Sequence, residues 1–163
     1  MTLRDILVAT DFSPASRPAL RRAIEMAREA GARLWIAHVA AMPVLPGSEG
    51  YFLPQMYDDL NLAIRTDAKK RLERLTAAAR KAGVRVSSLL LDGIPHEALH
   101  RAARRHHADL LVMGTHGRTG VARLFVGSVA ARVVATAPRP VLTVRAAAGA
   151  GGAGPRRASR RAS

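Results

Sequence analysis

The residues best suited to chemistry form a glycine-rich stretch from Gly114 to Ser128, which reads GTHGRTGVARLFVGS. Glycine has no Cβ, so its backbone N–H groups can approach an anion closely and a positive φ costs it little. We expect a helix to start at Ser128, where a hydroxyl group and the positive end of the helix dipole both favour phosphate. The stretch therefore predicts a phosphate site. It contains neither the Gly-Lys-Ser/Thr of a Walker loop nor the Gly-x-Gly-x-x-Gly turn of dinucleotide-binding proteins.

A second stretch, residues 96–100, reads HEALH and so has the H-E-x-x-H spacing of zinc proteases. Histidines four residues apart share one face of a helix, and the glutamate between them is the base in such enzymes. The extended zinc motif needs a glycine where Ala103 stands, and a continuing helix turns His106 off the face that His100 occupies. The segment also has the apolar face of a helix that packs on a sheet, so we favour a structural helix over a zinc site.

Five short apolar segments alternate with amphipathic segments, and these elements must position the glycine-rich stretch. The apolar runs predict strands at residues 3–10, 34–39, 84–91, 110–113 and 141–145. Between them, apolar residues at helical spacing predict helices from the Ser13-Pro14 cap to Gly31, over about 55–82, over 95–106, and through Val133-Val134. This alternation predicts a doubly wound α/β fold, a parallel five-stranded sheet with helices on both faces.

The composition suits one domain with a buried core, because the chain has 163 residues, of which 48% are hydrophobic. It has no cysteine, which excludes disulfides, a thiol nucleophile and cysteine-based zinc sites. Its first residues lack the profile of a secretion signal, and no apolar run approaches the ~18 residues of a membrane-spanning helix. We therefore expect a cytoplasmic protein without a membrane span.

The charge is strongly basic, with 26 Lys and Arg residues against 12 Asp and Glu and a net charge of +14. Such a charge suggests nucleic acid or acidic membranes as partners. Aromatic residues make up only 4% of the chain, too few for a surface that stacks nucleic-acid bases. A basic nucleic-acid-associated protein therefore remains an alternative, but we do not expect nucleic acid to be the main partner.

The last residues differ from the rest of the chain. Residues 147–163 consist only of Ala, Gly, Pro, Ser and Arg, and no apolar pattern continues there. We therefore divide the chain into a domain over residues 1–146 and a disordered basic tail over residues 147–163.

The glycine-rich stretch resembles a known signature. The spacing Gly114-x2-Gly117-x9-Gly127-Ser128 is similar to the nucleotide-binding signature G-x2-G-x9-G-[S/T] of the universal stress protein family. The resemblance extends over about residues 3–145. The further matching segments are Ile6–Ser13, His38-Val39, Ala108–Gly114 and Arg139–Val144.

The resemblance implies an adenine nucleotide alpha hydrolase-like sheet with strand order 3-2-1-4-5 and ATP, with Mg²⁺, bound across the ends of strands 1 and 4. The order reverses between those two strands, which opens a crevice where ligands bind in such sheets. By position, Asp11 suits hydrogen bonds to ribose or adenine, Val39 packs on adenine, and the glycine-rich stretch holds ribose and phosphates. The residues implied at the nucleotide are Ala9, Thr10, Asp11, Val39, Met113, Gly114, Thr115, His116, Gly117, Arg118, Thr119, Gly120, Gly127, Ser128 and Val129. Arg118 and Arg123 either pair with phosphate or are solvated surface charges.

These features favour an ATP-binding universal stress protein that acts as a nucleotide-dependent regulatory or stress-response factor. A slow ATP hydrolase on the same scaffold is the alternative, but the sequence offers no assured general base and no paired carboxylates after the glycine-rich stretch. The resemblance also implies a homodimer that pairs the last strand, Val141–Arg145, with its copy, because an apolar edge strand invites another strand.

Overall fold

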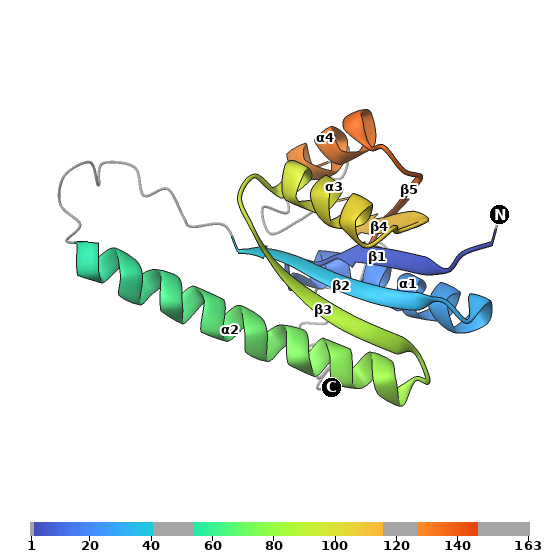
Figure 1. The fold of residues 1–163 in the computed structure, drawn as a ribbon, viewed down its shortest axis with the longest axis horizontal. Coiled ribbons are helices and arrows are strands. Elements are labelled where there is room, and N and C mark those ends of the chain that lie inside the picture. The colour runs from blue at the N-terminus through green and yellow to red at the C-terminus, as the bar shows by residue number, and fades with distance from the viewer. Residues whose placement is uncertain (1, 41–53, 116–126, 147–163) are drawn as a thin grey trace, which may run out of the picture.

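The computed structural model describes residues 2–40, 54–115 and 127–146, which form a parallel sheet covered by helices on both faces (Figure 1). Five strands pair in the order β3-β2-β1-β4-β5, and every pairing is parallel. The strands are β1 (Asp5–Ala9), β2 (Arg33–Ala40), β3 (Arg85–Asp92), β4 (Leu110–Gly114) and β5 (Val141–Val144). The predicted fold class and strand order are therefore confirmed.

The helices form two layers. A 3-10 helix, η1 (Pro14–Ser16), leads into α1 (Arg17–Ala30), which packs on one face of the sheet with α2 (Pro54–Lys81). On the other face lie α3 (Pro95–Arg105) and α4 (Ser128–Thr136). The stretch with the HEALH sequence forms α3, and Ala98, Leu99 and Ala102 are buried, so the prediction that its apolar face packs on the sheet is confirmed.

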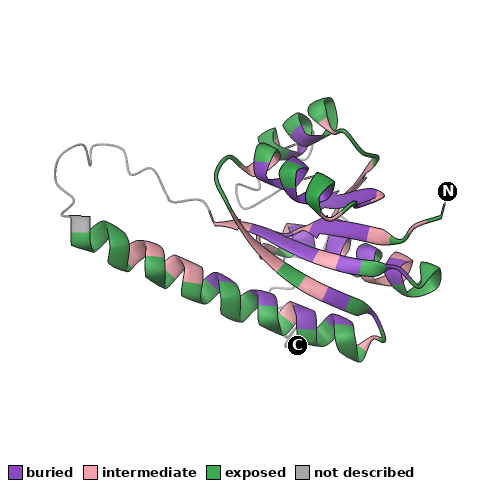
Figure 2. Ribbon diagram, in the orientation of Figure 1, coloured by how far each residue is buried: buried purple, intermediate pink, exposed green. Residues whose placement is uncertain are grey.

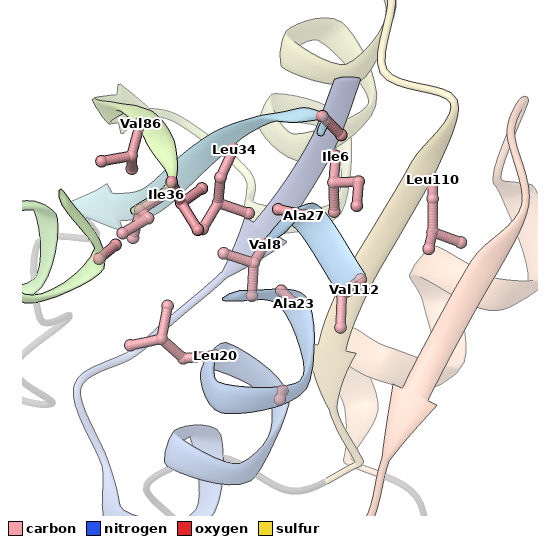
Figure 3. Close-up of a cluster of buried hydrophobic side chains, with 14 of the residues drawn as sticks. Ile6, Val8, Leu20, Ala23, Ala27, Leu34, Ile36, Val86, Leu110 and Val112 are labelled. Carbon is pink, nitrogen blue, oxygen red and sulfur yellow. The ribbon is translucent and has the colours of Figure 1, made fainter. Parts of the chain in front are cut away.

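Two hydrophobic clusters lie on the two faces of β1. Its residues Ile6, Leu7 and Val8 have no exposed surface, and successive side chains point to opposite faces. Ile6 and Val8 join the α1 and α2 side (Figure 3), whereas Leu7 joins the α3 and α4 side. Figure 2 shows the result, a sheet whose central strands are buried and whose helices bury the side that packs on the sheet, except in the N-terminal part of α2, which has no buried residue up to Asp67. This burial explains why the central strands appear in the sequence as continuous apolar runs.

Local sequence signals set the helix ends. Gly31 adopts a left-handed φ of 62° and ends α1, as its position predicted. Ser13 caps η1 rather than α1, because its side chain accepts a hydrogen bond from the Ser16 N–H. The fifth strand stops one residue earlier than predicted, at Val144. The predicted tail, residues 147–163, lies outside the described residues. Within the described ranges, no helix is long and apolar enough to cross a membrane.

One carboxylate joins the start of β1 to the start of β4. Asp109 Oδ2 accepts hydrogen bonds from the backbone N–H groups of Arg4 at 2.7 Å and Asp5 at 3.1 Å. These two bonds hold the pKa of the Asp109 carboxyl below its ordinary value of 3.8. The charged carboxylate therefore sets how the two central strands begin side by side.

We expect Asp109→Ala to lower the free energy of unfolding by about 1–3 kcal/mol, because two backbone donors lose a charged acceptor. Asp109→Asn keeps a neutral acceptor and should cost less. Since the pKa is lowered in the folded protein, the advantage of Asp over Asn is present at neutral pH. It is lost as the pH falls from 3.8 through the lowered value. Urea unfolding at neutral and acidic pH tests this; an Asp–Asn difference that is independent of pH would contradict it.

Candidate functional site

A cavity of about 320 Å³ opens at the carboxyl ends of β1 and β4, where the strand order reverses. Ligands in doubly wound sheets bind at this kind of position, and the volume falls at the lower end of the range of small-molecule sites. The cavity is lined by Ala9, Thr10, Asp11, Ser16, Ala37, Val39, Pro95, Leu99, Met113, Gly114, Thr115, Gly127, Ser128, Val129 and Ala130.

The structure brings most of the predicted site residues together. Ten of them line this cavity: Ala9, Thr10, Asp11, Val39, Met113, Gly114, Thr115, Gly127, Ser128 and Val129. The other five, His116, Gly117, Arg118, Thr119 and Gly120, lie outside the described residues, as does Arg123.

Sequence reasoning missed five lining residues: Ser16, Ala37, Pro95, Leu99 and Ala130. Two of them had a usable signal. Ala37 pairs with Ala9 across the sheet, so once Ala9 is placed in the site the register places Ala37 there too. Pro95 starts the helix that follows β3, and parallel topology puts that end of the helix at the same edge of the sheet. The others depend on tertiary packing, which no local pattern reports.

The turn after β1 is held by a compact set of side-chain hydrogen bonds. The buried Thr10 hydroxyl accepts from the Phe12 N–H at 3.1 Å and bonds the Ser16 hydroxyl at 3.1 Å. Asp11 Oδ1 accepts from the Ser13 hydroxyl at 2.6 Å and from the Ser13 N–H at 3.0 Å. Polar residues that bond the backbone two positions on are typical of tight turns. The sequence TDFS therefore builds its own turn and fixes the Asp11 carboxylate at the cavity.

Asp11 is charged at neutral pH. Burial by itself would raise the pKa of its carboxyl, but the hydrogen bonds from Ser13 and Ser16 outweigh burial and hold the pKa below 3.8. The cavity therefore contains a fixed acceptor, which suits hydroxyl or amine donors of a ligand.

The rings of Phe12 and His38 pack against each other at this turn. Phe12 adopts a left-handed φ of 64°, which is rare for a bulky residue and needs tertiary support. Its ring packs on His38, with centroids 4.2 Å apart, and the Arg71 guanidinium lies 5.6 Å from its centroid. His38 Nδ1 lies 2.8 Å from the Thr10 carbonyl oxygen, so this nitrogen carries the proton and donates. His38 and α2 thus hold the turn in its strained conformation.

The opposite side of the cavity is the N-terminal end of α4. Gly127 stands at the N-cap and supplies no side-chain oxygen, and the first N–H groups of a helix lack intrahelical partners. The Gly127 N–H itself donates to the Thr115 carbonyl at 2.7 Å, which ties this helix end to the end of β4. Gly127 has a φ of −57°, so it does not use the positive φ that glycine tolerates. Its value at the site is the absence of a side chain.

The chemistry of the cavity is amphipathic. Val39, Leu99 and Met113 form apolar walls, whereas Asp11 and the α4 end carry opposite electrostatic character. Among the residues that the structure describes, no group of three or more His, Cys, Asp or Glu side chains is placed to hold a metal ion. The arrangement suits a ligand with a flat apolar part and an anionic part.

Sequence comparisons identify the relatives of this chain. A family model described as "Universal stress protein family" matches residues 2–145. A universal stress protein of Thermus aquaticus is 40% identical over 147 residues, covering 87% of this chain and 98% of the relative. One of Methanocaldococcus jannaschii is 31% identical over 142 residues, covering 87% of this chain and 82% of the relative.

Solved structures show the same fold. Universal stress protein UspA from Lactobacillus plantarum matches with a TM-score of 0.76 and 26% identity, covering 89% of this chain and 99% of that one. A universal stress protein from Archaeoglobus fulgidus in complex with dAMP matches with a TM-score of 0.61 and 26% identity, covering 89% of this chain and 100% of that one. A universal stress protein in complex with cAMP matches with a TM-score of 0.62 and 28% identity, covering 89% of this chain and 99% of that one.

We expect Thr10→Val to lower the free energy of unfolding by about 1–3 kcal/mol, because it leaves the Phe12 N–H without its acceptor and removes the hydrogen bond between the Thr10 and Ser16 hydroxyls. Thr10→Ser keeps the hydroxyl and is the matched control. Thermal and urea unfolding of both variants measure the effect. Equal stability of Thr10→Val and the wild type would show that this bond does not hold the turn.

Proposed function

The chain belongs to the universal stress protein family, and from this premise we propose that it is a cytoplasmic ATP-binding protein with a nucleotide-dependent regulatory role in the stress response. The observation that carries the proposal is the cavity itself. It combines an apolar wall, a fixed carboxylate and a helix N-terminus at the reversal of strand order. Relatives of the same fold that bind dAMP and cAMP support an adenine nucleotide as the ligand.

Each part of the nucleotide has a matching part of the cavity. The adenine ring would pack against Val39, Leu99 and Met113, which are apolar. The Asp11 carboxylate would accept hydrogen bonds from ribose hydroxyls or the adenine amine. The phosphates would lie at the N-terminal end of α4, near the Ser128 hydroxyl, where unpaired N–H groups and the helix dipole favour negative charge.

Mg²⁺ would enter with the phosphates. The described residues offer no cluster of metal-ligating side chains, and Mg²⁺ commonly binds through substrate phosphates and water with few protein ligands. The residues present therefore fit a magnesium ion that ATP brings with it.

Binding rather than hydrolysis is the function that the cavity supports. Asp11 is the one carboxylate among the described lining residues, and it is engaged by Ser13 and Ser16. Mass spectrometry of the purified protein should identify a bound adenine nucleotide, and a phosphate-release assay with Mg²⁺ should stay near background. The proposal would be contradicted if the purified protein carries no nucleotide and also fails to bind ATP in a titration.

We expect Gly127→Val to weaken ATP binding strongly, because a branched side chain at the N-cap blocks the approach of phosphate to the helix end. Its φ of −57° is accessible to valine, so the variant should fold. Ser128→Ala should raise the Kd by about 2- to 12-fold, the effect of one lost hydrogen bond. Calorimetric titration with ATP measures both. An unchanged affinity for ATP in folded Gly127→Val would contradict the placement of the phosphates at this helix end.

We also propose that the protein forms a homodimer through β5. Among the strands that the structure describes, β5 is at the edge of the sheet and pairs only with β4. The Val144 carbonyl accepts a hydrogen bond from the Thr115 N–H, and the Pro140 carbonyl accepts one from the Leu111 N–H. The backbone N–H and carbonyl groups of the even-numbered residues in β5 therefore point toward β4. Because backbone groups alternate along a strand, the N–H groups of Val141 and Thr143 face the open edge. A second copy would pair with these.

We expect Thr143→Pro to give a folded monomer at micromolar concentration, because it removes a donor from the open edge only. Val144→Pro is the informative comparison, since it removes a donor that faces β4 and should lower stability instead. Sedimentation velocity and thermal unfolding distinguish the two effects. A dimer that survives Thr143→Pro would place the interface elsewhere.

A further inference from the structure

The N-terminal end of α2 extends beyond the sheet (Figure 1). Residues 55–62, here called the α2 tip, expose three large apolar side chains: Met56 is 51% exposed, Tyr57 50% and Leu62 66%. Between them lie Asp58 and Asp59, which are also exposed. An exposed group of apolar side chains is typical of an interaction surface, and here it is combined with negative charge.

The acidic pair is exceptional in this chain. Asp58 and Asp59 are the only two adjacent acidic residues in a sequence with 26 basic and 12 acidic residues. Three other exposed acidic side chains pair with arginine: Asp92 with Arg65, Asp67 with Arg71, and Glu97 with Arg101. Within the described ranges, neither Asp58 nor Asp59 pairs with a basic group.

A groove of the opposite character lies between the edge strand β3 and α3. Residues 88–92 form its floor, and Leu89 and Leu91 are only partly buried there. The wall contains Arg104 and Arg105, which are exposed and, in the described part of the chain, form no ion pair. The acidic groups at the groove, Asp92 and Glu97, are already neutralised by arginines. The groove is therefore apolar at its floor and positive at its wall.

We propose that the α2 tip of a second copy of this chain docks in the groove between β3 and α3. Asp58 and Asp59 would face Arg104 and Arg105. Met56 and Leu62 lie on the same side of the helix as the two aspartates and would cover Leu89 and Leu91, whereas Tyr57 lies on the other side of the helix. The tip is short enough for the groove, because eight helical residues span about 12 Å and five strand residues about 16 Å. The tip belongs to α2, which packs on the opposite face of the sheet from α3, so the groove takes the tip of another copy.

The symmetry of this contact allows a closed assembly. Each copy carries one tip and one groove, so two copies that exchange tips would satisfy both surfaces. The contact is small and rich in charge, so it is weaker than the β5 pairing and sensitive to salt. We therefore expect a second association step: the species that is present at micromolar concentration associates further at high protein concentration.

Charge reversal tests the pairing. The double variant Asp58→Arg with Asp59→Arg makes the tip positive, and Arg104→Asp with Arg105→Asp makes the groove negative. In sedimentation velocity up to hundreds of micromolar, each variant alone should raise the Kd of the second association step about tenfold or more. An equimolar mixture of the two variants should restore the second association step. In a mixed pair, the positive tip of the tip variant meets the negative groove of the groove variant, and the wild-type tip of the groove variant meets the wild-type groove of the tip variant.

Matched controls separate this pairing from the effect of net charge. Glu29→Arg with Glu73→Arg changes the charge as the tip variant does, and Lys69→Asp with Lys70→Asp changes it as the groove variant does; all four side chains are exposed. These controls should associate as the wild type does. The proposal is overturned if the wild type shows no second step, if the controls weaken it equally, or if the mixture of tip and groove variants fails to restore it.

Discussion

The fold depends on the complete burial of β1. Ile6, Leu7 and Val8 have no exposed surface, and β1 pairs with β2 on one side and β4 on the other. A strand in this position cannot shift by one residue without moving its side chains to the wrong face of the sheet. Its two ends are therefore fixed in space. The start is held by Asp109, and the end delivers Thr10 and Asp11 to the cavity.

Because β1 is rigid, the turn that follows it can hold strain. A left-handed φ at Phe12 costs free energy, and residues of this kind persist only where the surroundings determine their conformation. Here the surroundings are the buried His38 ring, which donates to the Thr10 carbonyl, and the Arg71 side chain on α2. The result is a carboxylate at a fixed position, and a fixed acceptor loses little entropy when it binds a ligand.

The sequence predicts those features of the site that local chemistry determines. Apolar runs such as Ile6–Ala9 predict buried strands, and Thr10 and Asp11 follow one of them directly. Leu99 and Ala130 join the cavity only because α3 and α4 pack side by side, which no local pattern states. The direction in which backbone groups of β5 face is likewise fixed by its register with β4. The sequence predicts that β5 has an open edge. It does not predict that the backbone N–H of Thr143 points to this edge and that of Val144 points to β4.

The scarcity of acidic residues gives each of them a larger structural effect. In a chain with a net charge of +14, a carboxylate meets many cations, yet several carboxylates here also accept hydrogen bonds from neutral donors. Asp5 accepts from the Trp35 indole N–H at 2.9 Å, Asp11 from Ser13, and Asp109 from two backbone N–H groups. Such bonds are directional and join particular elements, whereas exposed ion pairs contribute little and are screened by salt. The carboxylates thus define positions in the fold, and the excess of arginine remains at the surface, where it governs which charged partners approach.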